Sequence, residues 1–156
     1  MTPAPSAAEP VPAGFRRLNL VENGFIDLCG PLYGRWADGR FTMGLRVEQR
    51  HCNPGGTCHG GMLLTLADMT MLIGSNLQAG LSRYLVTINL ATDFIAPAPR
   101  GAWIEGRVDV LRASKNLLFA QGSLSVEDGI VARISGIFKP TGEPNERFAL
   151  PAYFAE

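Results

Sequence analysis

The sequence predicts a single α+β domain in which one long central helix packs against a mostly antiparallel sheet. An apolar run from Met62 to Leu77 follows directly on a glycine-rich loop, as is typical of a buried helix. Alternating apolar and polar residues, separated by short turn signals, indicate several strands. The 156 residues suffice for one hydrophobic core. We expect a flexible arm at 1–12, the domain at 13–140 and a tail at 141–156.

The elements before the central helix are short. Apolar positions across 15–28 predict an amphipathic helix that ends near Gly30, where a Gly-Pro pair stops it. Strands at 32–36 and 41–47 flank the Asp38-Gly39 pair, which is a strong signal for a tight hairpin turn.

Four further strands are expected after the central helix, at 84–95, 102–112, 117–126 and 130–139, with short turns between the last three. In the first of them, alternation predicts that Thr87 lies on one face and a row of apolar residues on the other. The tail after Pro140 becomes apolar near its end, and we expect it to pack on a neighbour. The apolar row is Val86, Ile88, Leu90 and Phe94; the tail residues are Phe148, Leu150, Tyr153 and Phe154.

Composition excludes several classes of protein. The formal net charge is zero, with 14 basic and 14 acidic residues, so neither nucleic acid nor an anionic membrane is an expected partner. The first twelve residues lack the basic start and apolar stretch of a secretory signal. The apolar run is too short and too interrupted to span a membrane. Three cysteines make no disulfide framework, and we expect a cytoplasmic protein.

Asp68 is the single carboxylate within the apolar helix. A buried carboxylate without a partner is costly, so it must be paired or have its pKa shifted toward the neutral form. Such a group suits a general base, although a purely structural aspartate remains the alternative.

The loop before the helix offers hydrogen-bond donors. Gly60 and Gly61 permit close approach of a ligand to the backbone, and the first N–H groups of a helix favour negative charge. Asn53 and His59 add side-chain donors nearby. This end of the helix could therefore stabilise an oxyanion that develops on a substrate carbonyl.

The histidines and cysteines of the loop also suggest two other chemistries. His51, Cys52, Cys58 and His59 could suggest zinc, but adjacent ligands fit poorly around one tetrahedral ion, and we expect no metal. Cys58 could be a thiol nucleophile, yet a cysteine at a helix start is more often a small packed residue that can react with oxidants.

The pattern Asn53-x5-His59-Gly60-Gly61-x6-Asp68 resembles the signature of hotdog-fold acyl-CoA thioesterases of the phenylacetate-degradation (PaaI-like) group. The similarity extends over about residues 25 to 139. It includes the segments 30–33, 86–90 and 93–97.

This resemblance implies a sheet wrapped round the central helix and a homodimer that joins two such sheets. Dimers of dimers are common in the group. It implies hydrolysis of an acyl-CoA to the free acid and coenzyme A. No cofactor is expected, since coenzyme A is part of the substrate. The acyl group stays open among aryl, hydroxyaryl and medium-chain types. Phe25, Leu32, Tyr33 and Trp36 could line its pocket or simply pack in the core.

The resemblance also assigns roles to residues of the pattern. The thioester carbonyl would accept hydrogen bonds from the Gly60 N–H and the Asn53 side chain, with His59 assisting at the thioester. Asp68 would activate water or attack directly. Thr87, where the family often has Ser or Thr, could hold the water with Asp68.

The turn after the second of the late strands carries Arg112, Ser114 and Lys115. In similar thioesterases basic groups near this turn contact the nucleotide, so these residues are candidates to bind the phosphates of coenzyme A. An ordinary solvated turn is the alternative.

Helix geometry adds a constraint on the site. Gly60 and Asp68 are eight residues apart, which is about 12 Å along a helix, too far to act on one carbonyl. A two-fold dimer with antiparallel central helices would pair the helix start of one chain with Asp68 of the other. We expect a site shared by the two chains of the dimer.

The main alternative function is a non-catalytic acyl-CoA-binding regulator on the same fold.

Overall fold

The computed structural model describes residues 9–20 and 22–156. Seven strands form one antiparallel sheet in the order β1-β2-β3-β5-β6-β7-β4. The strands are β1 (Arg16–Arg17), β2 (Tyr33–Ala37), β3 (Arg40–Arg46), β4 (Tyr84–Phe94), β5 (Trp103–Ala113), β6 (Leu118–Val126) and β7 (Gly129–Thr141). The helices are α1 (Gly24–Cys29), α2 (Gly60–Gln78) and α3 (Leu150–Tyr153), with 3-10 turns η1 (Gln49–His51) and η2 (Glu146–Phe148).

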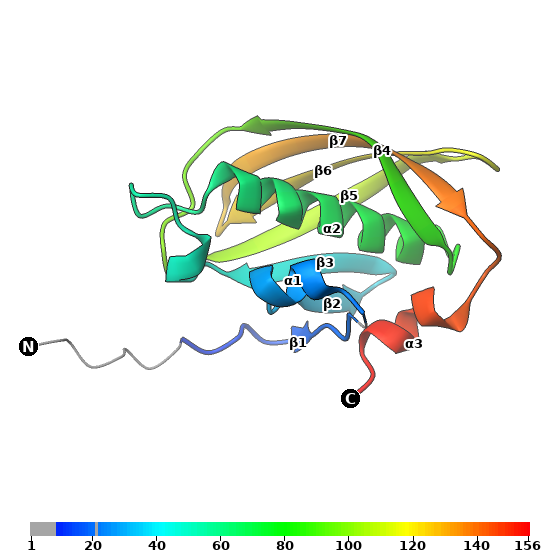
Figure 1. Ribbon diagram of the computed structural model, residues 1–156, viewed down its shortest axis with the longest axis horizontal. Helices are drawn as coiled ribbons and strands as arrows, with labels where there is room; N and C mark the ends of the chain where they lie inside the picture. The colour runs from blue at the N-terminus through cyan, green and yellow to red at the C-terminus, as the bar shows by residue number, and fades with distance from the viewer. Residues whose placement is uncertain (1–8, 21) are drawn as a thin grey trace, which may run out of the picture.

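The sheet curves around α2, with β4 to β7 on one side of the helix and β2 and β3 on the other (Figure 1). This arrangement confirms the predicted α+β fold with one long helix and an antiparallel sheet. The Asp38-Gly39 turn between β2 and β3 also forms as predicted, since both residues have the positive φ that a two-residue hairpin turn requires.

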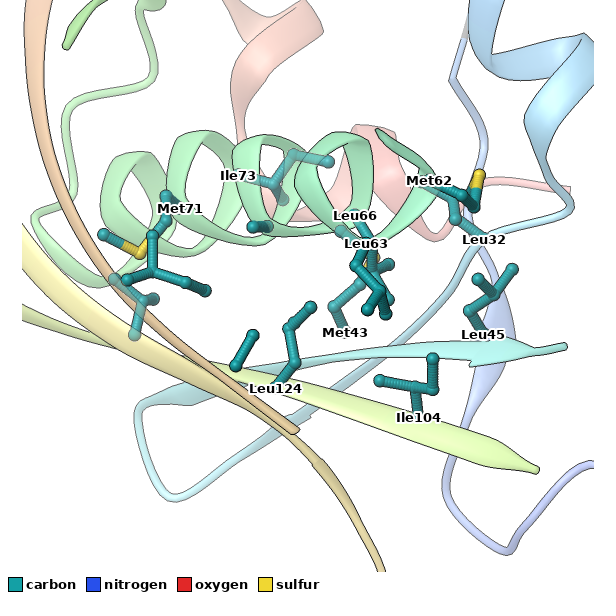
Figure 2. Packing of buried hydrophobic residues seen from close by; sticks show 14 of the residues in the cluster. Leu32, Met43, Leu45, Met62, Leu63, Leu66, Met71, Ile73, Ile104 and Leu124 are labelled. Atoms are coloured by element: carbon teal, nitrogen blue, oxygen red, sulfur yellow. The ribbon is translucent and has the colours of Figure 1, made fainter. Parts of the chain in front are cut away.

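The core lies between α2 and the concave face of the sheet. Leu63, Leu66 and Met71 point from α2 toward strand residues such as Leu124 (Figure 2). Helix and sheet approach closely where side chains are absent, because a Cβ on Gly74 would stand 2.3 Å from Val108 Cγ1. This face of α2 therefore has no room for larger residues.

The helix predicted across 15–28 is wrong over its first half. Residues 16–17 form β1 and pair with β2, and α1 begins only at Gly24. Phe15 and Leu18 are buried on either side of β1, and Phe15 packs edge-on against Trp103. Extended pairing with β2 buries both residues, and so tertiary contacts override the weak helical spacing.

The single apolar face predicted for β4 is also wrong. A bulge between Thr87 and Asn89 shifts the alternation, so that the inward face passes from Leu85 and Thr87 to Leu90. Ile88 is consequently 55 % exposed. Thr87, the last residue before the bulge, faces α2 together with Leu85, and the bulge brings Leu90 to the same side.

The chain ends behave differently from one another. Of the predicted flexible arm, residues 1–8 lie outside the described residues, while Glu9 and the Pro10 carbonyl accept hydrogen bonds from Arg46. The C-terminal tail, expected to pack on a neighbour, packs on its own chain beside α1 and α2 (Figure 1). None of the helices in the described part is long and apolar enough to cross a membrane.

Candidate active site

The loop before α2 is held by its own hydrogen bonds. The Asn53 Oδ1 accepts from the Gly55 N–H at 3.0 Å, and the Asn53 amide donates to Thr57 Oγ1 at 3.1 Å. Cys52 and Cys58 face each other in a short antiparallel bridge that closes the loop. Within one chain, Asn53 therefore shapes the loop, and a change of its amide orientation would be needed to free it for a substrate.

His51 ties this loop to α1. Its Nδ1 accepts from the Glu48 N–H at 2.9 Å, so its Nε2 carries the proton and donates to the Cys29 carbonyl at 2.5 Å. The ring is 3 % exposed, and burial lowers the pKa of His51. Sequence reasoning considered this residue only as a metal ligand and missed its role as a buried neutral brace.

His59 caps the N-terminus of α2. Its Nδ1 accepts from the Gly61 N–H at 2.8 Å, which places the proton on the exposed Nε2. The Gly60 N–H donates to no protein acceptor within the described residues. The helix start thus presents two donors, the Gly60 N–H and His59 Nε2–H, to whatever lies in front of it.

Phe94 covers this helix start. A Cβ on Gly60 would lie 3.6 Å from its ring, an ordinary contact. The sequence pattern assigned Phe94 only to an apolar row of a strand, and no local signal links it to Gly60. Phe94 is itself 55% exposed, so its ring stands beside the helix start and leaves it open to solvent.

Asp68 and Thr87 are brought together by α2 and β4. The Thr87 hydroxyl donates to Asp68 Oδ1 at 2.7 Å. Burial raises the pKa of the Asp68 carboxyl, and the Thr87 hydrogen bond opposes this by stabilising the ionised form. The carboxylate keeps its second oxygen available, because Thr87 is its only protein partner among the described residues.

Asp68 lines a cavity of about 880 Å³, a volume within the usual range of ligand pockets. Its walls come from α1, one face of α2, β4 and the C-terminal tail. Of the four aromatic and aliphatic residues considered for a pocket, Phe25 lies in this wall, whereas Leu32, Tyr33 and Trp36 do not. The α2 residues in the wall are Leu64, Thr65, Asp68, Met69, Leu72, Ile73 and Asn76.

The chain does not bring all the candidate residues to one place. The turn with Arg112 and Lys115 lies at the end of α2 opposite to Gly60 (Figure 1), and the Ser114 hydroxyl closes that turn through Leu117. Asp68 stands between the two ends. In one chain the structure therefore joins Asp68 with Thr87 but leaves Gly60 and the basic turn apart.

Metal and thiol chemistry find no support in the loop. Across residues 9–20 and 22–156, no three His, Cys, Asp or Glu side chains gather as a metal site. Burial raises the pKa of the Cys58 thiol to about 11, so the thiolate that nucleophilic attack requires is scarce at neutral pH. Cys58 behaves as a packed core residue.

An antiparallel sheet wrapped round one long helix is the arrangement of the hotdog fold. The family model of the thioesterase superfamily matches residues 55–132. An esterase-named protein of Pseudomonas aeruginosa, PA0474, is 35% identical over 129 residues, which are 82% of this chain and 96% of that protein. The chain belongs to the thioesterase superfamily and is a thioester hydrolase.

Other relatives agree with this assignment. Human acyl-coenzyme A thioesterase 13 is 30% identical over 57% of this chain and 63% of its own length. The solved structure of PA5202 from Pseudomonas aeruginosa is 27% identical, covers 76% of this chain and 94% of its own, and has a TM-score of 0.69.

Two structures of lower identity show the shared fold. The E. coli PaaI protein of the phenylacetic acid degradation operon is 20% identical, with 79% of this chain and 88% of that one covered and a TM-score of 0.69. The BH2602 protein of Bacillus halodurans, solved with CoA, is 24% identical, with 70% and 74% covered and a TM-score of 0.64. The resemblance read from the sequence is confirmed, and the fold is the hotdog fold.

Proposed function

We propose that the protein hydrolyses acyl-CoA thioesters, with Asp68 as the general base and the Gly60 N–H as the oxyanion donor. The observation that carries this proposal is the Asp68 carboxylate in an apolar cavity, held by Thr87 and with a raised pKa. The names of similar proteins support the substrate class: one is an acyl-coenzyme A thioesterase and another was solved with CoA.

The reaction needs a base, a water and an oxyanion site. Asp68 removes a proton from water, and the water oxygen attacks the thioester carbonyl carbon. Negative charge then develops on the carbonyl oxygen and is stabilised by the Gly60 N–H and, with a reoriented amide, by Asn53. Collapse breaks the C–S bond and releases the free acid, and the sulfur of coenzyme A takes the proton that Asp68 removed from water, which leaves Asp68 ionised again. Direct attack by Asp68 through an anhydride is the competing route.

Thr87 has a positioning role in this scheme. Its hydroxyl donates to Asp68 Oδ1, and its oxygen lone pairs remain able to accept a hydrogen bond from the attacking water. His59, with its Nε2–H exposed at the helix start, donates to the thioester group. Coenzyme A is the only cofactor-like group required, and it enters as part of the substrate.

The site is proposed to be shared by two chains. Gly60 and Asp68 of one α2 stand about 12 Å apart along the axis, beyond the reach of one carbonyl. An antiparallel pair of α2 helices in a homodimer places Gly60, Asn53 and His59 of one subunit opposite Asp68 of the other. Arg112, Ser114 and Lys115 are proposed to bind the coenzyme A phosphates, at the exposed turn between β5 and β6.

The first test is thiol release from a panel of acyl-CoAs by the native protein and by Asp68→Asn. Loss of the base should lower kcat by roughly 10²–10⁴-fold. The melting temperature near neutral pH should not fall, because the amide removes a partly buried charge. Near-native turnover by Asp68→Asn would show that the carboxylate is structural.

The second test mixes subunits of Asp68→Asn with subunits of a bulky variant, Gly60→Val. A mixed dimer would contain one site with both lesions and one with neither, so thiol release should reappear up to about a quarter of the native rate when subunits redistribute at random. Exchange is verified with differently tagged chains. Activity that stays absent after exchange would contradict a shared site.

A further inference from the structure

The C-terminal segment, residues 145–155, forms one wall of the cavity that contains Asp68. Its Phe148, Ala152 and Tyr153 face the cavity together with α1 and α2. The match to the thioesterase superfamily ends at residue 132, so this wall lies beyond the part of the chain that the family model describes. The match to the family therefore says nothing about this wall of the cavity.

A buried asparagine holds this wall against α2. Asn76 is 2 % exposed; its amide donates to the Phe148 carbonyl at 2.7 Å, and its Oδ1 accepts from the Arg83 N–H at 3.0 Å. The Asn19 N–H donates to the Tyr153 carbonyl at 2.9 Å. A buried polar side chain with every polar atom used fixes its partners in one arrangement.

Tyr153 lies at the far end of the cavity from Asp68. Burial raises the pKa of the Tyr153 hydroxyl and the neighbouring Asn76 side chain opposes this, which places the ring beside the last turns of α2. Phe148 extends this wall toward β4, where its ring centroid is 5.7 Å from that of Tyr84. Two aromatic rings, those of Tyr153 and Phe148, therefore line this end of the cavity.

The length of the cavity follows from the helix that forms its floor. Asp68 and Asn76 lie on one face of α2, eight residues or about 12 Å apart. Carbon–carbon bonds near 1.5 Å advance an extended alkyl chain by roughly 1.3 Å each, which leaves space for about eight carbons once the Tyr153 ring is in place. A much longer chain would meet that ring.

We propose that the C-terminal segment closes the acyl site and that Tyr153 limits it to acyl chains of about eight carbons or fewer. This inference rests on the proposed acyl-CoA hydrolysis at Asp68. In this proposal the accepted length of the acyl chain is determined by the C-terminal segment, which Asn76 holds in place, and not by the sheet or by the loop before α2.

The test compares kcat/KM for butanoyl-, octanoyl-, dodecanoyl- and hexadecanoyl-CoA. The native protein should prefer the two shorter substrates. Tyr153→Ala should raise the ratio of the dodecanoyl to the octanoyl value by about tenfold or more, because removal of the ring opens apolar space. Tyr153→Leu makes a smaller opening, should shift the ratio in the same direction, and serves if the alanine variant does not fold.

Two controls separate length from general damage. Tyr153→Phe keeps the ring and should retain the native order of substrates. Tyr33→Ala removes the same atoms from a tyrosine that packs on Trp103 outside the cavity, and should leave the order unchanged. An unchanged order in both Tyr153→Ala and Tyr153→Leu, or an equal shift in Tyr33→Ala, would overturn the role of Tyr153. Absence of thiol release by the native protein from every acyl-CoA would instead overturn the proposed function.

Discussion

The two faces of α2 perform different tasks. The face toward the sheet carries Leu66 and Ala67, both fully buried, and Gly74, whose hydrogen atom is all that the space beside Val108 permits. The other face carries Leu64, Thr65 and Asp68 and borders the cavity. The same helix therefore combines a closely packed surface with an open one that bears the only carboxylate.

The packed face of α2 stabilises the fold, and the cavity face of the same helix carries the candidate catalytic base. Apolar burial on the packed face anchors the helix, so the open face can tolerate a partly buried carboxylate that costs some stability. The raised pKa of Asp68 is a consequence of its place between the packed core and the cavity. Variants that change the free energy of unfolding without changing turnover, or turnover without changing stability, test this comparison of the two faces.

The largest effect is expected from two leucines on opposite faces. Leu66 is 0% exposed and Leu64 is 39% exposed, so Leu66→Ala should lower the free energy of unfolding by roughly 2–5 kcal/mol and Leu64→Ala by less than about 1 kcal/mol. Chemical denaturation of both variants measures this. Equal losses would show that the cavity face contributes to the core as much as the packed face.

A smaller effect is expected at the helix start. Gly60→Ala adds a methyl group beside the free N–H, which should lower kcat by about tenfold or more while the fold accepts the Cβ at 3.6 Å from Phe94. Gly24→Ala is a matched control at the first residue of α1, where the added Cβ meets nothing within 4 Å. Similar kinetics for both variants would argue against an oxyanion role for Gly60.

The smallest effect concerns the pH dependence of the cavity face. Activity requires ionised Asp68, so kcat/KM should rise with pH through the raised pKa of Asp68. Thr87→Val removes a hydrogen bond that lowers this pKa, and the acidic limb should move to higher pH. Thr141→Val, which removes a hydroxyl bonded to the Tyr84 carbonyl, should leave the limb in place.

If the acidic limb of the kcat/KM profile stays unchanged in Thr87→Val, ionisation of Asp68 does not determine that limb. A limb that moves to lower pH would contradict the direction of the hydrogen-bond effect, since loss of a partner that stabilises the carboxylate can only favour its protonated form.

Most of the elements could be predicted from the sequence because their signals are local. The Asp38-Gly39 pair demands two residues with positive φ, and a long apolar run behind a glycine pair indicates a buried helix. The proximity of Thr87 to Asp68 was also anticipated, through the resemblance to a family rather than from local spacing. The turn and the helix are each encoded within a few consecutive residues, whereas the Thr87–Asp68 pair joins residues 19 apart and has no local signal.

Long-range contacts decided the remainder. The bulge at β4, which turns Thr87 and Leu90 to the same side, depends on pairing with β7 and leaves no mark in the alternation of residues. The placement of Phe94 over Gly60 and of Tyr153 at Asn76 joins segments far apart in the chain. Composition and periodicity report which residues prefer to be buried, whereas the partner of each buried residue is determined only when the sheet closes around α2.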